Sequence, residues 1–302
     1  NSGMSHIVIS GSASITATDM DSVQGSIGVK ADGYGTGTPL IEITGGEIVG
    51  GYWGVSSSVW EETNTQTAKA VMTGGKITSS GSPGRGGGII VQSFGLGDSE
   101  LRMEGGSVET VYFYGLDALT NNGNSDATAT VTMTGGSVKV TGDQGRGIRS
   151  ASLGTGTSIV NFSGGEVTTS GDASKTIIID NNTNAAATGN AIANITGGKL
   201  RNSGNGTPSD GAAYVVYAVQ AGSGDAIINL DATDGPAEVT ATGSDAFGLF
   251  AENVNSGSGQ INMNGGKVTV SGADSIGVSA YAAGGAQTEI NLLGGRVTAS
   301  GD

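Results

Sequence analysis

The chain has 302 residues, 57 of them glycine, and a formal net charge of −14 at pH 7. This acidic balance argues against nucleic acid, which calls for a basic patch, and against anionic lipid surfaces. Because the chain contains no cysteine, it forms neither disulfide bonds nor thiolate metal sites. Composition alone would place so glycine-rich a chain near disordered proteins, but its periodicity indicates a folded repeat.

The repeated element is a Gly-Gly pair followed two residues later by Val, Ile or Leu, and it returns about every 30 residues. A degraded copy lies near Gly235, and a looser tenth copy lies at 11–15. One solenoid can absorb any chain length by adding turns, so we predict a single β-helix domain over residues 1–302. The turns are centred on the pairs that begin at Gly45, Gly74, Gly105, Gly135, Gly164, Gly197, Gly265 and Gly294.

The sequence of each turn predicts three strands, which follow one another in chain order. An alternating run precedes the Gly-Gly pair, and its period of two indicates a half-buried strand, as at 41–43, 131–133 and 290–292. A second strand follows the pair and points one aliphatic residue per turn to the same side. A third strand usually begins with Gly before an aliphatic residue, as at 54–55, 115–116 and 277–278. Two turns lack this glycine, and their third strands are expected at 176–179 and 215–217.

Three short strands per turn, separated by bends rich in Gly, Ser, Asn and Asp, predict an all-β fold, a parallel β-helix of about nine to ten turns. Each strand then pairs with its copy one turn away, and aliphatic residues stack into a continuous core. Other all-β solutions fit worse, because a propeller blade needs about 40 to 50 residues. An antiparallel sandwich would give no reason for aliphatic residues to recur in one register.

The outward positions of the first strand predict a polar ladder. Asparagine stands between the two core residues of this strand in five successive turns, so that the amides can hydrogen-bond from turn to turn. A polar binding strip, an ice-matching lattice and a structural ladder all fit this pattern. Self-association through this face would use Asn161, Asn194, Asn229, Asn262 and Asn291.

The turn INMNGGKVTVSGADSIGV at 261–278 resembles the passenger domains of type V autotransporters, particularly the pertactin-like and AIDA-like group. Residues 131–148 and 289–301 repeat much of the same pattern. The resemblance implies a right-handed β-helix that is exported through an outer-membrane barrel and then stays on the bacterial surface or is released. It also implies an adhesin or self-associating factor, with the signal peptide and the barrel outside this segment.

Residues for catalysis are poorly represented. The one histidine, His6, lies in the predicted end turn, so a Ser-His-Asp site and a multi-histidine metal site are not expected. We predict no catalytic residues, no metal and no cofactor. Polysaccharide cleavage would need two carboxylates converging at about 5 to 9.5 Å. The candidate carboxylates are expected instead to be solvated bend residues: Asp98, Glu100, Asp117, Asp126, Asp180, Asp225 and Glu252.

Aromatic residues gather in three consecutive turns, and sugar-binding proteins use such rings as stacking platforms. Trp60, Phe94 and Tyr112 are the exposed candidates, and the acidic residues Glu61 and Glu62 stand beside Trp60. These five residues form the predicted ligand-binding set. Corner or core packing is expected instead for Trp53, Tyr114, Tyr214, Tyr217, Phe250 and Tyr281.

The expected function is that of a non-enzymatic adhesin on the bacterial surface or outside the cell. Its expected partner is a host glycan, an extracellular-matrix protein or another copy of itself. No run of about 18 apolar residues exists, so this segment is not expected to insert into a membrane. Two alternatives stay open: a β-helix polysaccharide lyase or glycoside hydrolase, and a structural spacer stalk.

Overall fold

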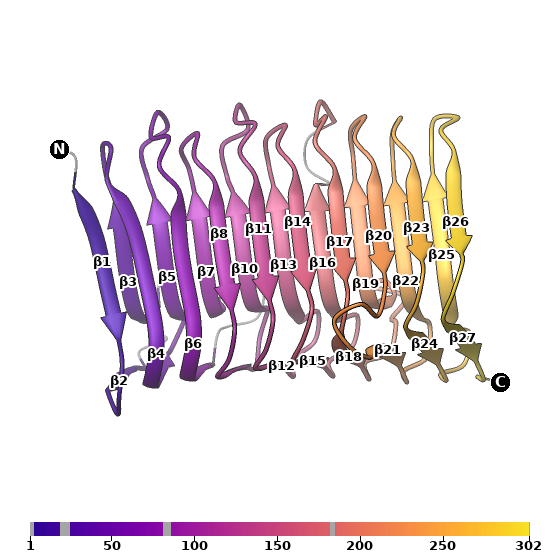
Figure 1. Ribbon diagram of the computed structural model, residues 1–302, viewed down its shortest axis with the longest axis horizontal. Coiled ribbons are helices and arrows are strands. Elements are labelled where there is room, and N and C mark those ends of the chain that lie inside the picture. Colours follow the sequence, from indigo (N-terminus) through magenta and orange to yellow (C-terminus); the bar gives the residue numbers. More distant parts are fainter. Residues whose placement is uncertain (1–2, 19–24, 81–85, 182–184, 302) are drawn as a thin grey trace.

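The computed structural model describes residues 3–18, 25–80, 86–181 and 185–301. Within these residues all regular structure is β-strand. The strands form an 18-stranded and a 9-stranded sheet, stacked turn upon turn into a rod whose two chain ends lie at opposite ends (Figure 1). The prediction of a parallel β-helix with three strands per turn is confirmed, and the rod has about nine turns.

Each turn contributes a strand to each of three faces, which we call the first, second and third face in chain order. The first and second faces share the 18-stranded sheet, because β4 and β6 run through both. The first face contains β1 (Met4–Ile9), β4 (Thr38–Gly50), β6 (Ala68–Ser79), β8 (Ser99–Met103), β11 (Ala129–Met133), β14 (Ser158–Phe162), β17 (Ala191–Ile195), β20 (Ala226–Leu230), β23 (Gly259–Met263) and β26 (Thr288–Leu292).

The second face contains β2 (Ser14–Ala17), the later parts of β4 and β6, β9 (Ser107–Thr110), β12 (Ser137–Val140), β15 (Glu166–Thr169), β18 (Gly198–Asn202), β21 (Ala237–Ala241), β24 (Lys267–Val270) and β27 (Arg296–Ala299). The 9-stranded sheet is the third face, with β3 (Ile27–Gly33), β5 (Trp53–Val59), β7 (Gly87–Ser93), β10 (Tyr114–Thr120), β13 (Arg146–Ser152), β16 (Lys175–Asn181), β19 (Ala213–Gln220), β22 (Ala246–Asn253) and β25 (Ile276–Ala282).

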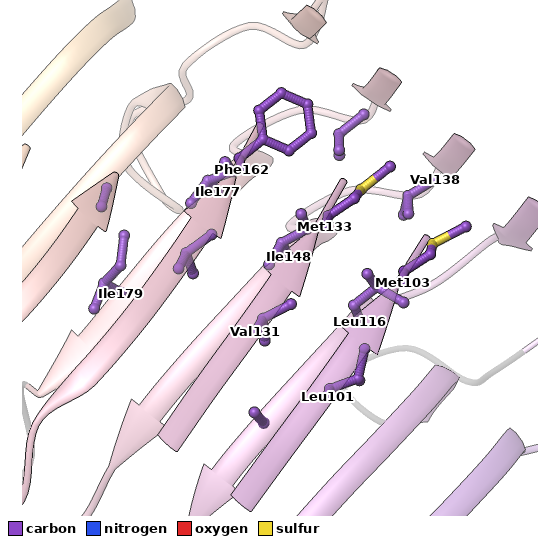
Figure 2. Close-up of a cluster of buried hydrophobic side chains, with 14 of the residues drawn as sticks. Leu101, Met103, Leu116, Val131, Met133, Val138, Ile148, Phe162, Ile177 and Ile179 are labelled. Atoms are coloured by element: carbon purple, nitrogen blue, oxygen red, sulfur yellow. The ribbon is translucent and has the colours of Figure 1, made fainter. Parts of the chain in front are cut away.

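The core lies between the three faces and follows the rod axis. Met133 of β11 stacks in register on Met103 of β8 and is followed by Phe162 of β14. Leu116 of the third face and Val138 of the second face belong to the same cluster, and all five side chains are buried (Figure 2). Because full burial of one such side chain contributes about 1.5–3 kcal/mol, the repeated columns provide the main stabilisation of the rod.

The recurrent glycines have two separate structural reasons. The second residue of the eight Gly-Gly pairs has φ between +76° and +89°, a region that glycine occupies without the penalty of a Cβ atom. The glycine of the third strand instead permits close approach to the second face. A Cβ atom at Gly115 would lie 2.3 Å from Val138 Cγ1 and 2.5 Å from the carbonyl oxygen of Gly147.

Candidate functional site

Trp60 and Phe94 each follow the end of a third-face strand, Trp60 after β5 and Phe94 after β7. The amide of Phe94 donates to the carbonyl oxygen of Val59 at 2.9 Å, which brings the two corners into register. Their rings stack with centroids 4.7 Å apart and an angle of 10° between the planes. The structure thus brings together two of the five predicted ligand-binding residues as an aromatic pair.

The second ring face of Trp60 is also occupied. Lys30 Nζ lies 5.4 Å from the Trp60 ring centroid, and the indole Nε1 donates to Asp32 Oδ1 at 2.8 Å. Trp60 is therefore held between neighbouring turns and presents mainly its edge, with 36% of its surface exposed. Phe94 itself is half-buried and is followed one turn further by Asn121.

An open hollow of about 540 Å³ lies beside this pair, next to the corner that follows β10. Asn122 joins the walls, since its Nδ2 donates to the carbonyl oxygens of Glu62 and Phe94, each at 3.3 Å. Its Oδ1 accepts from the amide of Asn124 at 3.0 Å. Within the described residues, the side chains of Glu62, Asn121 and Asn124 have no hydrogen-bond partner. The hollow is lined by Trp60, Glu62, Thr63, Phe94, Leu96, Asn121, Asn122, Gly123 and Asn124.

Two residues of the predicted ligand-binding set lie elsewhere. Tyr112 stands between β9 and β10, at the corner between the second and third faces, whereas Trp60 stands at the corner between the third and first faces. Glu61 follows Trp60, but its side chain does not line the hollow. The sequence pattern does not mark the asparagines of the hollow. Their one signal is the run NNGN at 121–124, one turn after Phe94.

The asparagine ladder of the first face is formed as predicted. Asn194 Nδ2 donates to Asn161 Oδ1 at 2.9 Å, and Asn229 Nδ2 donates to Asn194 Oδ1 at the same distance. Asn262 continues the chain at 3.0 Å and Asn291 at 2.9 Å. The five amides thus form one continuous hydrogen-bonded row on the outer surface. Whether this row also mediates self-association stays a prediction.

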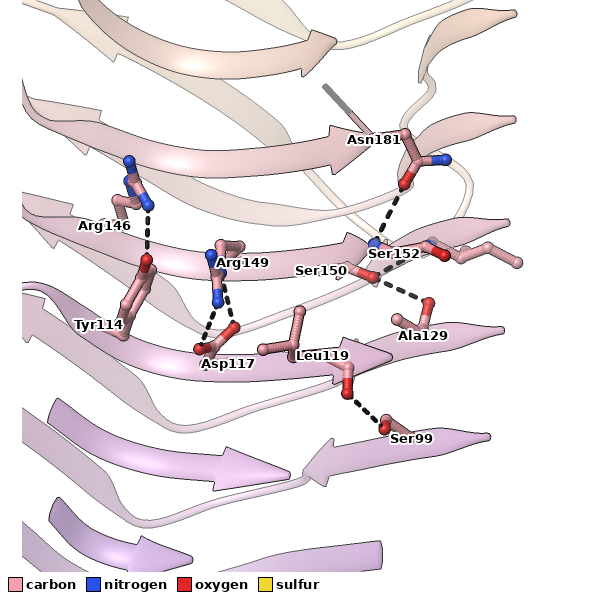
Figure 3. Close-up of polar contacts among 11 residues, drawn as sticks. Ser99, Tyr114, Asp117, Leu119, Ala129, Arg146, Arg149, Ser150, Ser152 and Asn181 are labelled. Atoms are coloured by element: carbon pink, nitrogen blue, oxygen red, sulfur yellow. Dashed lines mark hydrogen bonds and ion pairs between the residues drawn. The ribbon is translucent and has the colours of Figure 1, made fainter. Parts of the chain in front are cut away.

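The expectation that the carboxylates are solvated bend residues is wrong for Asp117. This residue lies within β10 and has no exposed surface, and its carboxylate accepts two hydrogen bonds from Arg149 (Figure 3). Glu252 lies within β22 and accepts a hydrogen bond from the hydroxyl of Tyr217. The reason is that side chains on the outer side of the third face pack against one another and bury polar groups between them.

The expectation of core packing is wrong for Tyr214, Tyr217 and Phe250. Val216 and Ala218 enter the core, so Tyr217 between them points outward. Its ring stacks on Tyr214 with a centroid distance of 4.5 Å and on Phe250 with a distance of 5.5 Å. The outer side of this face therefore carries a half-buried aromatic cluster that consists of Tyr214, Tyr217, Phe247 and Phe250.

Trp53 and Tyr114 stack at 6.1 Å on the same side, across the strand that begins at Gly87. With Ile90 they form a small cluster that is separate from the main core.

Among the described residues, no group of three or more His, Asp or Glu side chains is placed to hold a metal ion. The described part of the chain also contains no helix long and apolar enough to cross a membrane. Comparisons with known protein families, curated proteins and solved structures found no match to this chain.

Proposed function

We propose that this chain is a non-enzymatic bacterial adhesin, displayed on the cell surface or secreted, that binds a glycan in the hollow beside Phe94. One observation carries this proposal. The hollow combines an aromatic ring with carboxylate and amide groups that have no hydrogen-bond partner within the described residues. The resemblance of residues 261–278 to autotransporter passengers supports the bacterial surface as the setting.

The chemistry of the hollow fits both surfaces of a sugar. The C–H face of a pyranose ring packs against an aromatic ring, and Trp60 and Phe94 both line the hollow. Sugar hydroxyls both donate and accept, and so do the amides of Asn121 and Asn124, while the Glu62 carboxylate accepts. The volume of about 540 Å³ lies in the range of about 300–1,000 Å³ that is typical of ligand sites.

Binding is better supported than cleavage at this site. Glu62 is the one carboxylate among the residues that line the hollow, and the nearby Asp32 carboxylate is bound to the indole of Trp60. Glycoside hydrolysis by a carboxylate pair needs a second acid at about 5 to 9.5 Å. A lyase or hydrolase is therefore the alternative, and a spacer stalk is the second alternative.

Self-association is a second candidate function, and one further observation favours it. Ile159, Ile192 and Ile227 stand in register on the outer side of the first face. They lie beside the asparagine ladder, two positions before each of its first three members. A strip of apolar side chains next to a row of amides gives two rods an extended surface for many weak parallel contacts.

A glycan and matrix-protein binding array tests the proposal, together with sedimentation of the protein alone. We expect selective glycan binding that weakens at least about tenfold in Phe94→Ala and in Glu62→Gln. Tyr112→Ala is the matched control and should bind normally, because Tyr112 lies at a different corner. Binding that survives both hollow variants would refute the hollow as the site. Release of new reducing ends would favour the hydrolase, and a monomer that binds nothing would leave the spacer.

A further inference from the structure

Two cationic residues lie side by side on the outer side of the third face. Arg146 begins β13 and Lys175 begins β16, and the two residues are directly paired in register. Tyr114 occupies the same position on the preceding strand and Tyr214 on the following one. The sequence therefore places two neighbouring positive charges between two tyrosine rings, about 4.8 Å apart from strand to strand.

Neither cation has a carboxylate partner within the described residues. Arg146 Nη1 donates to the hydroxyl of Tyr114 at 2.6 Å, whereas its Nε is buried and has no partner (Figure 3). Lys175 Nζ donates only to the carbonyl oxygen of Ala173, at 3.3 Å. Arg149, three residues further along β13, by contrast donates two hydrogen bonds to the carboxylate of Asp117.

The two side chains lean away from each other. The guanidinium of Arg146 lies 5.1 Å from the ring centroid of Phe113, toward the preceding turn. The ammonium of Lys175 lies 5.6 Å from the ring centroid of Tyr214, toward the following turn. Both residues are half-buried. Burial and, to a smaller extent, the charge of Arg146 lower the pKa of Lys175 to about 8.

The nearby carboxylates compensate this pair only in part. Asp180 and Asp210 raise the pKa of Lys175, but their effect is smaller than that of burial and Arg146. The Asp210 carboxylate is occupied by Gln144, whose Nε2 donates to Oδ1 at 2.9 Å. An external anion that draws the two side chains toward each other would satisfy both, and the guanidinium can donate two parallel hydrogen bonds to one carboxylate.

We infer that Arg146 and Lys175 form a binding site for the carboxylate of an acidic sugar, whose ring packs along the aromatic cluster that begins at Tyr214. The cluster follows Lys175 directly in the rod and is half-exposed, so apolar surface lies beside the cations. A sugar that carries one carboxylate matches this combination of surfaces. Because the net charge of −14 repels long polyanions, the expected ligand is short and carries little charge.

This site is separate from the hollow beside Phe94, because Arg146 and Lys175 stand at the beginning of third-face strands, whereas the hollow lies beyond the ends of such strands. Phe94→Ala therefore distinguishes the two proposals. It should weaken glycan binding in the hollow and leave binding at the Arg146–Lys175 site unchanged.

The test is an NMR titration of the folded chain with methyl β-glucuronide, and methyl β-glucoside serves as the matched neutral sugar. We expect millimolar binding of the glucuronide, at least about tenfold weaker binding of the glucoside, and a similar loss in Arg146→Gln and Lys175→Gln. Lys267→Gln removes an exposed lysine from the second face and should bind normally. Equal binding of the two sugars, or unchanged binding in both glutamine variants, would overturn the inference.

Sodium acetate distinguishes a sugar site from a simple anion site. Acetate should bind at least about tenfold more weakly than the glucuronide, and equal affinities would overturn the assignment to a sugar. A second measurement uses the native chain and needs no variant. Acylation of the Lys175 amine at about pH 8 should be slowed by the glucuronide and not by the glucoside. Acylation that both sugars leave unchanged would also overturn the inference.

Discussion

The guanidinium of Arg149 donates two hydrogen bonds to the carboxylate of Asp117, from Nε to Oδ1 at 2.8 Å and from Nη2 to Oδ2 at 2.9 Å. Asp117 has no exposed surface, and the side chain of Arg149 is 13% exposed. The ring of Tyr114 covers the pair, with its centroid 4.3 Å from Arg149 Cζ. A β-helix with an apolar core thus also carries a buried ion pair on the outer side of its third face.

This pair predicts a sharp difference between single and double variants. Arg149→Met leaves the buried Asp117 carboxylate without its partner, and we expect the free energy of unfolding to fall by about 3–5 kcal/mol. The double variant Asp117→Leu with Arg149→Met removes both charges and should recover most of that loss. Denaturant midpoints for the three proteins provide the measurement. A double variant less stable than Arg149→Met would show that the ion pair stabilises the fold by more than the cost of burying its two charges.

The close approach of two faces at Gly115 leads to a second prediction. In Gly115→Ala the new methyl group would meet Val138 Cγ1 and a backbone oxygen of the next turn, so we expect a loss of about 1–3 kcal/mol in stability. Gly123→Ala is the matched control, because its Cβ would meet only the Leu153 carbonyl oxygen, at 3.9 Å. Thermal unfolding of both variants checks this, and equal melting temperatures would contradict the steric explanation.

The architecture was predictable because a solenoid repeats one set of positions. Asn194 and Asn229 could be placed opposite each other because each stands between the two core residues of a first-face strand, and every turn returns to the same register. The outer layer of the third face was not predictable in the same way. The spacing aligns Asp117 with Arg149, but the outward position by itself indicates exposure, whereas long neighbouring side chains bury this pair.

The hollow shows another limit of the sequence pattern. Trp60 and Tyr112 lie within three turns of each other, and sequence distance does not tell which corner of the rod each one occupies. Their positions relative to the strands decide this: Trp60 follows a third-face strand, whereas Tyr112 follows a second-face strand. The asparagine run at 121–124 reaches the hollow for the same reason as Trp60, because it follows β10 of the third face.

The asparagine ladder predicts that a negative charge lowers stability more inside the ladder than outside it. Asn229→Asp removes the donor to Asn194 Oδ1 and sets a carboxylate oxygen against it, while Asn262 can still donate. We expect a loss of about 1–3 kcal/mol at neutral pH. Asn264→Asp adds the same charge at an exposed position outside the ladder and should cost far less. Urea unfolding compares the two variants, and an equal loss in both would count against the ladder.

Lys175 predicts how stability changes with pH. Its pKa in the folded chain is lowered to about 8 from an ordinary value of 10.5, chiefly by burial and then by Arg146. Between these values the unfolded chain binds more protons than the folded chain, so the free energy of unfolding contributed by this residue rises with pH. Lys175→Met removes the titrating group, and the rise from about pH 7.5 to 9.5 should become smaller.

The pH range from about 7.5 to 9.5 also excludes the titration of the buried tyrosines from the comparison. Burial raises the pKa values of Tyr114 and Tyr214 above 10.0, and these groups act in the opposite direction at higher pH, because the unfolded chain loses its tyrosine protons first. Lys267→Met is the control, since this lysine is exposed and its variant should keep the wild-type slope. Urea unfolding at several pH values gives the three slopes. Parallel slopes for wild type and Lys175→Met would contradict the lowered pKa of Lys175.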